Sequence, residues 1–360
     1  MIFQALIRPI LFRLEPEVAH NRALQLAETL GHSRIAREAL ETLFCVEDRR
    51  LQQTVFGIDF LNPVGLAAGF DKNAVALPLW PSLGFGFLEI GSVTTRAQGG
   101  NPTPRLFRLE NQRALINHMG FNNDGADAIA GRLSSRIPVG VNVGKHRDVE
   151  LRDAASDYAE TIAKFRGRAD FFVLNVSSPN TPGLRKLQER EMLDELLTTV
   201  TGGRASRRAE TDGGSAEASP SKRSPVVLKL SPDLNFDQLD DALELARRHG
   251  IAGIVATNTT TNHPTPPEGG LSGAPLRERA TECIRHIWRQ TDGMLPIVGV
   301  GGIFTAGDAY VKIRAGASLV EVWTALVYEG PGIVRNINRG LLRLLERDGF
   351  GSIAEAVGTE

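Results

Sequence analysis

The pattern of hydrophobic and polar positions along the chain changes near residue 55. From there onward, short runs of apolar or β-branched residues end in Gly, Ser, Asn or Thr, and a helical pattern follows each run. The eight runs are NPVGLAAG from Asn62, GFLEIGS from Gly86, PVGVNVG from Pro138, FFVLNVSS from Phe171, VVLKLS from Val226, AGIVATN from Ala252, PIVGVGG from Pro296 and SLVEVWT from Ser318. Strands that alternate with helices pair in parallel, because a helix must cover each crossover. Eight such units predict an α/β fold, a (β/α)8 TIM barrel.

A doubly wound open sheet is the competing α/β architecture. A sheet of this kind that binds a dinucleotide carries a glycine-rich fingerprint after its first strand. The one candidate turn, GVGGI from Gly299, follows the seventh run and lacks the fingerprint spacing. The barrel is therefore favoured.

The N-terminal residues follow a helical pattern instead. The stretch MIFQALIRPILFRL forms an apolar stripe at i, i+4 spacing that carries basic residues, and a second helix is expected from Pro16 to a stop at Gly31. We therefore expect an amphipathic two-helix extension over residues 1–45 and a barrel over residues 46–360. Such a stripe either packs on the body of the protein or rests on a membrane surface, and the pattern leaves both open.

Two segments depart from the strand-and-helix rhythm. Residues 201–224 read TGGRASRRAETDGGSAEASPSKRS, with no aromatic residue and no aliphatic residue larger than alanine. Because such a segment buries too little apolar surface to fold, we expect a disordered insertion there. The stretch NHPTPPEGGLSGAP after the sixth run is expected to be a long ordered loop on the side of the barrel that holds the site.

The composition is ordinary for a soluble protein. A net charge of −1 over 360 residues argues against a broad nucleic-acid-binding surface. Cys45 and Cys283 are too few for a disulfide framework and no metal-ligand spacing is present, so we expect no metal site and a reducing compartment. No apolar run is long enough to span a bilayer and no signal-peptide cleavage site is seen, which predicts a cytoplasmic protein.

Amide and hydroxyl side chains gather where the predicted strands end, and these ends converge in a barrel. The strand-end residues are Lys72, Ser92, Asn142, Asn175, Ser177, Ser178, Lys229, Thr257, Asn258, Thr259, Gly301, Gly302 and Thr324. Carboxylates are nearly absent from this set, so a neutral, planar, hydrogen-bonded ligand is favoured over paired-carboxylate hydrolysis. The stretch from Phe171 to Leu184, FFVLNVSSPNTPGL, is either an ordinary turn or part of this site.

Two further features bear on the ligand. Gly301 and Gly302 with Thr324 occupy the usual phosphate position of the fold, which indicates a phosphorylated ligand or cofactor. Lys72 and Lys229 are either ordinary strand-end lysines or, if both face the cavity, a pair that stabilises negative charge, as on a reduced flavin. His118 and His146 lack a sequence-level partner that would make either a base, and both are interpreted as structural.

Eight motifs in register give the chain a family resemblance. They are LAAGFDKN, FLEIGSVT, NPTPRLFRL, INHMGFNN, NVSSPNTPGLR, ATNTT, GGLSG and GVGGI. Together with EPEVAH near the N-terminus, they resemble the quinone-dependent (class 2) dihydroorotate dehydrogenases over nearly the whole chain except residues 201–224. The resemblance implies an FMN-containing barrel that oxidises (S)-dihydroorotate to orotate in pyrimidine (UMP) biosynthesis and passes the electrons to a membrane quinone.

The resemblance also implies the site residues. FMN would be held by Ala68, Gly69, Phe70, Asp71, Lys72, Ser92, Asn142, Asn175, Lys229, Thr257, Gly273, Gly302, Thr324 and Ala325. Dihydroorotate would be held by Lys72, Asn117, His118, Met119, Gly120, Phe121, Asn175, Asn180, Asn258 and Thr259. Ser178 matches the catalytic base that takes the C5 proton while hydride leaves C6. Because serine is a weak base, Thr181, Phe121 and a water are expected to form a proton relay.

The same resemblance selects the electron acceptor. Relatives linked to fumarate or NAD have a cysteine at the base position and lack the N-terminal helices, whereas this chain has Ser178 and those helices. The helices are thus expected to form a quinone tunnel at the cytoplasmic face of the inner membrane, with the protein bound peripherally and Arg108 and Trp323 beside the quinone. Two departures stand out: Trp323 replaces the family's usual tyrosine, and Thr324–Ala325 replaces Ser-Gly.

Two other functions compete with this interpretation. A flavin barrel similar to the RNA-modifying dihydrouridine synthases would require a loop cysteine and a basic face, and the sequence shows neither. A membrane-associated binding module that has lost catalysis would require a broken site, whereas Ser178, Lys72 and the asparagines are intact.

Overall fold

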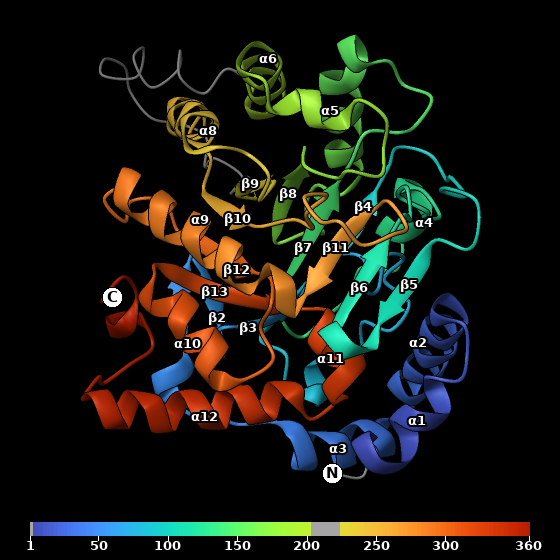
Figure 1. Cartoon of the computed structure of the whole chain (residues 1–360), viewed down its shortest axis with the longest axis vertical. Coiled ribbons are helices and arrows are strands. Elements are labelled where there is room, and N and C mark those ends of the chain that lie inside the picture. The colour runs from blue at the N-terminus through green and yellow to red at the C-terminus, as the bar shows by residue number, and fades with distance from the viewer. Residues whose placement is uncertain (1–2, 203–223) are drawn as a thin grey trace.

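Eight parallel strands close into a barrel in the computed structural model, which describes residues 3–202 and 224–360 (Figure 1). The barrel strands are β3 (Val64–Leu66), β4 (Phe87–Val93), β7 (Val139–Val143), β8 (Phe171–Asn175), β9 (Val226–Leu230), β10 (Gly253–Ala256), β12 (Ile297–Val300) and β13 (Ala317–Val322). Each strand lies within one of the eight predicted runs or extends beyond it by a single residue, and β13 pairs with β3 to complete the ring. The predicted (β/α)8 barrel is confirmed, and the open sheet is wrong.

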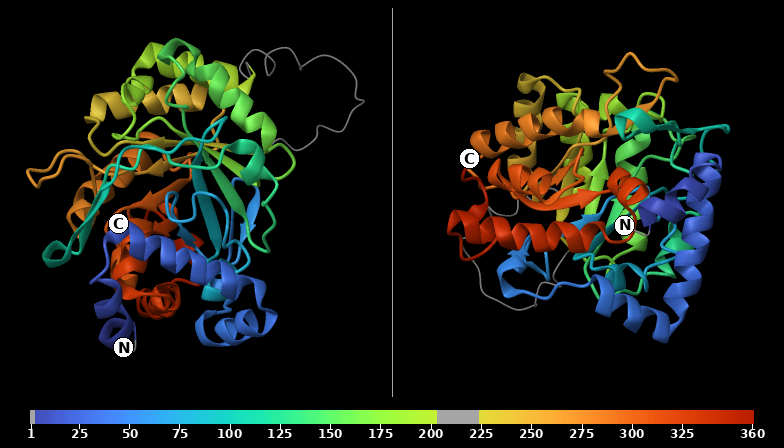
Figure 2. Two further views of the ribbon diagram at one scale, coloured as in Figure 1. Left: turned by 90° about the vertical axis from the view of Figure 1, so that its right-hand side faces the viewer. Right: turned by 60° about the horizontal axis from the view of Figure 1, so that its bottom comes forward.

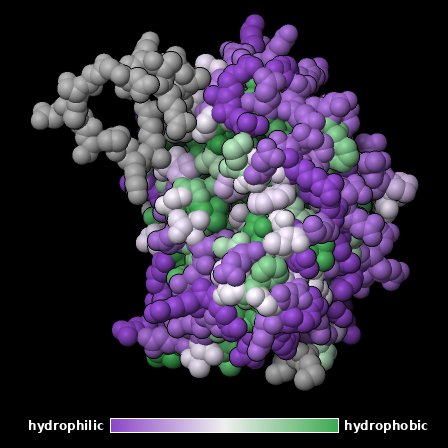
Figure 3. Space-filling model, turned by 90° about the vertical axis from the view of Figure 1, so that its left-hand side faces the viewer, coloured by the Kyte–Doolittle hydropathy of each residue, from purple (hydrophilic) through white to green (hydrophobic). Residues whose placement is uncertain are grey.

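Helices cover the outside of the barrel. They are α4 (Ala126–Ala130), α5 (Ala154–Lys164), α6 (Arg190–Thr201), α8 (Phe236–Arg248), α9 (Arg277–Gln290), α10 (Ala306–Arg314), α11 (Thr324–Glu329) and α12 (Ile333–Asp348). In α8, Leu239, Ala242 and Leu243 face the barrel while charged residues face water. On the face of the molecule that carries α8, α9 and α10, hydrophobic residues form small areas between hydrophilic ones (Figure 3).

The interior of the barrel is apolar at the end where the strands begin. Phe87, Phe171, Val227 and Leu319 form one buried cluster there. A Cβ atom at Gly65 would lie 2.3 Å from the Phe87 ring, so this glycine leaves the space that the ring fills. The antiparallel hairpin of β1 (Gln53–Val55) and β2 (Ile58–Phe60) adds Val55 and Phe60 to the cluster and closes this end.

A small antiparallel sheet lies over the other end of the barrel. It consists of β5 (Leu106–Leu109), β6 (Ala114–Asn117) and β11 (Gly270–Gly273), in the order β11-β6-β5. The sequence pattern does not predict this sheet, and the expected loop NHPTPPEGGLSGAP contains β11. Strands of four residues carry little pattern of their own, and β11 pairs with a strand more than 150 residues earlier in the chain.

The N-terminal residues form more helix than predicted. A short π-helix at Phe3–Ile7 is followed by α1 (Arg8–Leu11), α2 (Pro16–His32) and α3 (Arg34–Phe44). Helix α3 was not expected. The predicted stop at Gly31 is also wrong, because Gly31 stays helical and α2 continues to His32. Gly31 is buried, and a Cβ atom there would lie 3.3 Å from the Leu79 nitrogen. These helices lie along one side of the barrel, and α3 lies near α12, where Arg335 donates a hydrogen bond of 2.9 Å to the Leu43 carbonyl (Figure 2).

Two further predictions concern the insertion and the absence of a membrane-spanning segment. Most of the insertion expected at residues 201–224, from 203 to 223, lies outside the described residues. Within the described ranges, no helix is both long and apolar enough to cross a membrane.

Candidate functional site

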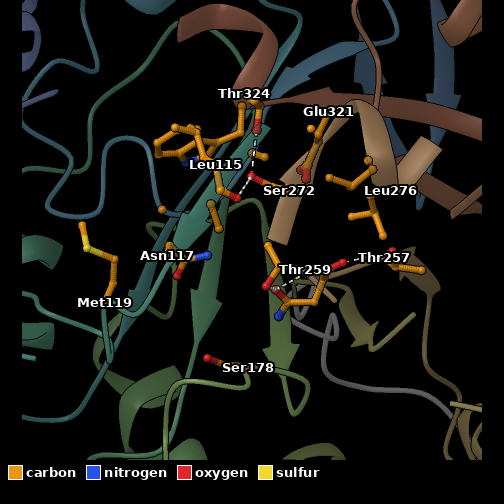
Figure 4. Close-up of a pocket in the computed structure, with 18 of the residues that line it drawn as sticks. Leu115, Asn117, Met119, Ser178, Thr257, Thr259, Ser272, Leu276, Glu321 and Thr324 are labelled. Carbon is orange, nitrogen blue, oxygen red and sulfur yellow. Dashed lines mark hydrogen bonds between the residues drawn. The ribbon is translucent and has the colours of Figure 1, made fainter. Parts of the chain in front are cut away.

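A cavity of about 160 Å³ opens between the ends of the barrel strands and the small sheet (Figure 4). Most of the residues predicted from the sequence line it. They are Ala68, Gly69, Lys72, Ser92, Asn117, Met119, Gly120, Phe121, Asn175, Ser178, Asn180, Lys229, Thr257, Asn258, Thr259, Gly273, Gly302, Trp323, Thr324 and Ala325. We call this the first cavity. Residues as far apart in sequence as Ala68 and Ala325 therefore meet there, as the convergence of strand ends predicts.

Several predicted cofactor residues lie behind the lining of this cavity. Asp71 is buried and accepts hydrogen bonds from the Val75 and Ala76 nitrogens and from the Trp80 indole, each at 2.9 Å. Asn142 is buried beneath the cavity. Phe70 faces a second cavity described below. Asp71 thus shapes the turn after β3, and it acts on the lining of the first cavity only through that turn.

Three other predicted residues also lie outside the lining. Thr181 is buried, and its carbonyl accepts the Leu184 N–H at 3.2 Å. His118 is exposed; its carbonyl accepts a hydrogen bond of 3.0 Å from Asn101, and its N–H donates to the Arg105 carbonyl at 2.7 Å. His146 is buried, and its backbone N–H donates to Asp157 at 2.8 Å.

An amide and hydroxyl network forms one wall of the first cavity. Asn175 Nδ2 donates to Ser92 Oγ at 2.8 Å and to Asn142 Oδ1 at 3.2 Å. Its Oδ1 accepts from Asn258 Nδ2 at 3.1 Å, and Asn258 Nδ2 also donates to Ser177 Oγ at 3.0 Å. Three strands and the loops after β8 and β10 contribute to this network, so the network fixes the side chains before any ligand arrives.

A buried charge cluster lies beside this network, and two of its members were not predicted from the sequence. Lys229 Nζ donates to Glu89 Oε1 and Oε2 at 3.0 and 3.1 Å and lies 3.9 Å from Glu321 Oε2. Carboxylates are thus present at the site, contrary to the prediction. Glu89 and Glu321 stand two residues after the interior Phe87 and Leu319, so the strand period of two would have placed both inside the barrel.

Lys72 supplies a second cation, and this one is half-buried. Within residues 3–202 and 224–360, its amine has no hydrogen-bond or ion-pair partner. Burial lowers the pKa of Lys72 to about 8, although the nearby Glu17 carboxylate opposes the shift. An unpaired ammonium group that lines a cavity is suited to bind an anionic group of a ligand.

The loop after β8 holds Ser178 at the cavity edge, at the end opposite Thr324 (Figure 4). Ser178 Oγ accepts the Asn180 N–H at 3.3 Å. Asn180 Nδ2 donates to Asn117 Oδ1 at 2.7 Å, and Asn101 Nδ2 holds the Asn180 carbonyl at 3.1 Å. Asn180 Oδ1 is buried and has no partner among the described residues, which leaves an acceptor for a ligand.

A second cavity of about 410 Å³ lies between the N-terminal helices and the barrel, and its lining is mainly apolar. Leu106, Leu115 and Trp323 line both cavities, so the two adjoin at these residues. Arg108 is the predicted residue on this side. Its guanidinium lies 4.1 Å from the Phe12 ring centre and donates to the Phe12 carbonyl at 3.1 Å. Its Nε is buried without a partner in the described part of the chain.

His20 also lines the second cavity, and the sequence analysis did not assign it a role. Its ring stacks on Trp323 with centres 5.7 Å apart and meets Phe70 edge-on at 4.9 Å. Burial lowers the pKa of His20 to about 3, and the charge of Lys72 lowers it further, so the imidazole is neutral near pH 7. The signal was available in EPEVAH, where His20 is three residues from Glu17 on one helix face.

Comparison with known proteins identifies relatives over the full length. The family model described as "Dihydroorotate dehydrogenase" matches residues 50–345. The chain is 49% identical to the dihydroorotate dehydrogenase (quinone) of Halobacterium salinarum, with 99% of each chain covered. It is 47% identical to the enzyme of the same name from Gloeobacter violaceus, with 98% of each covered.

Solved structures agree with these relatives. A crystal structure of DHODH from Eimeria tenella in complex with ferulenol superposes with a TM-score of 0.84 at 35% identity, and covers 96% of this chain and 95% of its own. The resemblance seen in the eight motifs is confirmed: the chain belongs to the dihydroorotate dehydrogenase family.

Proposed function

We propose that the protein oxidises (S)-dihydroorotate to orotate, a step of pyrimidine biosynthesis, and passes the electrons to a quinone. The observation that carries the proposal is the pair of adjoining cavities. One is lined by amides, hydroxyls and two lysines, which suits a polar pyrimidine, and the other is apolar, which suits a quinone. The full-length relatives named as quinone-dependent dihydroorotate dehydrogenases support the same reaction.

FMN is the proposed cofactor, and the residues of the first cavity fit it. Gly302, with φ of +71°, and Thr324, which hydrogen-bonds to Ser272 at 2.9 Å, stand at the strand ends where this fold commonly binds phosphate. Lys229 would stabilise negative charge on the ring system, and Asn175 and Thr257 would hydrogen-bond its edges. The flavin supplies the hydride acceptor that no side chain of the protein provides.

Dihydroorotate would bind at the amide-lined part of the same cavity. Lys72 would hold its carboxylate, because its ammonium group has no competing partner. Asn117, Asn180 and Asn258 would contact the ring amides and carbonyls, and the free Asn180 Oδ1 supports this assignment. The hydrogen bond between Asn180 and Asn117 sets the spacing of two of these contacts.

Ser178 would remove the C5 proton. Ser178 is 6% exposed and lines the first cavity, so bound substrate would close it from bulk water. The buried Thr181 and Phe121 would form the relay that carries the proton outward through a water. Phe121 has φ of +54°, and Gly144 leaves room for its ring, since a Cβ there would lie 2.6 Å from a ring carbon. The ring is thereby held at the cavity.

The second cavity would hold the quinone. Arg108 would donate to a quinone carbonyl through its unpartnered Nε, and Trp323 would lie between quinone and flavin. We add His20 to this site, because its neutral ring stacks on Trp323 and lines the cavity. Trp323 replaces the tyrosine usual in the family, which makes it the position expected to set quinone preference.

Residues 1–45 would rest on the membrane as an extension of the barrel at 46–360. The side chains of Leu6, Ile10 and Ile35 are 64%, 64% and 82% exposed on the N-terminal helices, and Arg13 and Arg34 are exposed near them. Apolar side chains with nearby basic groups suit the surface of an anionic bilayer. We place the protein peripherally at the cytoplasmic face of the inner membrane.

Spectroscopy of the purified protein tests the proposal. A flavin spectrum should bleach when dihydroorotate is added anaerobically and return when a quinone is added. Ser178→Ala should slow the bleaching by roughly 100-fold or more, the usual worth of a positioned base. Ser318→Ala, at the opposite end of the barrel, is the matched control and should bleach normally. A bound flavin that does not respond to dihydroorotate would refute the proposed reaction.

A further inference from the structure

Glu321 belongs to the buried charge cluster, and the proposed reaction assigns it no role. It is 2% exposed, and it lines the first cavity together with Lys229. Its Oε2 accepts no hydrogen bond from any described residue, and its nearest cation is Lys229 Nζ at 3.9 Å. A buried carboxylate oxygen without a donor is costly, so its presence needs a physical explanation.

The charges of the cluster do not balance if every group is ionised. Two carboxylates and one ammonium group would leave one buried negative charge beside the cavity. Glu89 receives two hydrogen bonds from Lys229 and a third from Asn142 Nδ2. Among the described residues, Glu321 receives no hydrogen bond from a cation, because Lys229 lies 3.9 Å from its Oε2, and its carboxyl group is within hydrogen-bonding reach of the Glu89 carboxylate. The donors therefore stabilise the charged form of Glu89, and the proton that balances the cluster belongs on Glu321.

The groups around Glu321 agree with this assignment. Burial raises the pKa of Glu321 well above its ordinary value, and the Glu89 carboxylate raises it further, against the opposing charge of Lys229. Glu89 on β4 and Lys229 on β9 are the titratable groups that face it. The neighbouring strands β3 and β12 carry none, and Lys312 of α10 is turned to Arg277 and Thr281.

We propose that Glu321 holds a proton at neutral pH and acts as a positioning residue that sets the net charge presented to the bound flavin through Lys229. The proposal rests on the proposed function, because it concerns a flavin beside Lys229. With Glu321 protonated, the cluster is neutral and Lys229 stabilises negative charge that develops on the flavin. With Glu321 ionised, the second carboxylate cancels that stabilisation.

Infrared spectroscopy tests the protonation state without any assumption about the cofactor. The purified holoprotein at pH 7 should show the carbonyl stretch of a protonated carboxyl group, and Glu321→Gln should remove it. Glu278→Gln, an exposed glutamate on α9, is the matched control and should keep it. A spectrum that Glu321→Gln leaves unchanged would overturn the proposal. If that variant does not fold, NMR of the native protein labelled at the glutamate carboxyl carbons should show one carboxyl that titrates far above the rest, and the absence of such a group would overturn the proposal equally.

The midpoint potential of the bound flavin tests the coupling. Because glutamine mimics the protonated acid, Glu321→Gln and the native protein should have equal potentials at low pH. As pH rises and Glu321 ionises, the native potential should fall below that of the variant. A difference that is the same at every pH, or no difference at all, would contradict the coupling. If the protein binds no flavin, the proposed function fails, whereas the infrared result still decides the charge state of Glu321.

Discussion

The ion pair between Glu17 of α2 and Arg105 joins the N-terminal helices to the site loops, and its loss should be measurable. Arg105 Nε lies 3.1 Å from both carboxylate oxygens of Glu17 and Arg105 Nη2 lies 2.8 Å from Oε1. The remaining Nη1 donates to the carbonyls of Gly99 and Asn101 at 2.6 and 2.8 Å. Both side chains are only 11% exposed, so water cannot replace a lost partner.

Glu17→Gln keeps the volume of the side chain and removes its charge. The buried Arg105 then lacks a counter-charge, and breaking such a pair costs about 3 kcal/mol or more. At ~2.1 cal/mol/K per residue, 360 residues give an unfolding entropy of roughly 0.75 kcal/mol/K, so the thermal midpoint should fall by roughly 4 °C. Differential scanning calorimetry at constant protein concentration and flavin loading measures this shift.

Glu38→Gln is the matched control for this experiment. It removes the same charge from a neighbouring helix, where Glu38 pairs with Arg34 at 2.6 Å but the two side chains are 58% and 83% exposed. An exposed pair of this spacing contributes at most about 0.5 kcal/mol, so the midpoint should move by less than roughly 1 °C. Equal shifts in the two variants would refute the claim that burial makes the Glu17 pair important.

Three further predictions test the two cavities and the barrel interior. Because Lys72 loses its charge above a pKa of about 8, the KM for dihydroorotate should rise as pH increases through that value. A Lys72→Met variant should have a high KM without that rise. A pH profile of kcat/KM for both proteins checks this. His20→Leu should raise the KM for quinone and leave anaerobic bleaching by dihydroorotate unchanged, and a slowed bleaching would count against its place in the quinone cavity. Gly65→Ala should destabilise the protein by ~1–3 kcal/mol, because its Cβ would lie 2.3 Å from the Phe87 ring, whereas Gly99→Ala has no atom within 4 Å to meet and should change the urea midpoint little.

The sequence predicted the barrel well because the pattern that identifies each strand is local. Each strand is a short apolar run that ends in a polar or small residue, and this pattern can be read within a window of eight residues. The convergence of Lys72, Asn175 and Thr257 on one cavity then follows from the fold, since strand ends meet at one end of a barrel. Most of the site could thus be placed without knowledge of any contact.

What the sequence did not predict depends on distant pairing or on burial. Strand β11 pairs with β6, far away in the sequence, and Gly31 lies inside a helix at a buried position close to Leu79, where a larger side chain would have little room. Glu321 was overlooked because a single charge in an apolar strand reads as a surface position until the barrel closes around it. Its role depends on Glu89 and Lys229, which lie 232 and 92 residues earlier in the chain.

One turn of α2 carries residues that act on both cavities. Experiments that assign a role to each cavity must therefore change these residues one at a time. Glu17 holds Arg105, which fixes the Asn101 that in turn binds the Asn180 carbonyl in the Ser178 loop. His20, three residues later on the same helix face, stacks on Trp323 between the cavities.

A truncation near Val55 would therefore do more than remove the proposed quinone site. It would leave Arg105 without its counter-charge, release one anchor of the loop that carries Ser178 and Asn180, and expose the apolar side of Trp323. Loss of activity in such a protein would not distinguish quinone binding from substrate binding. Substitutions at His20 and Glu17 do distinguish them, because the first contacts the apolar cavity and the second acts through the loop that carries Asn180.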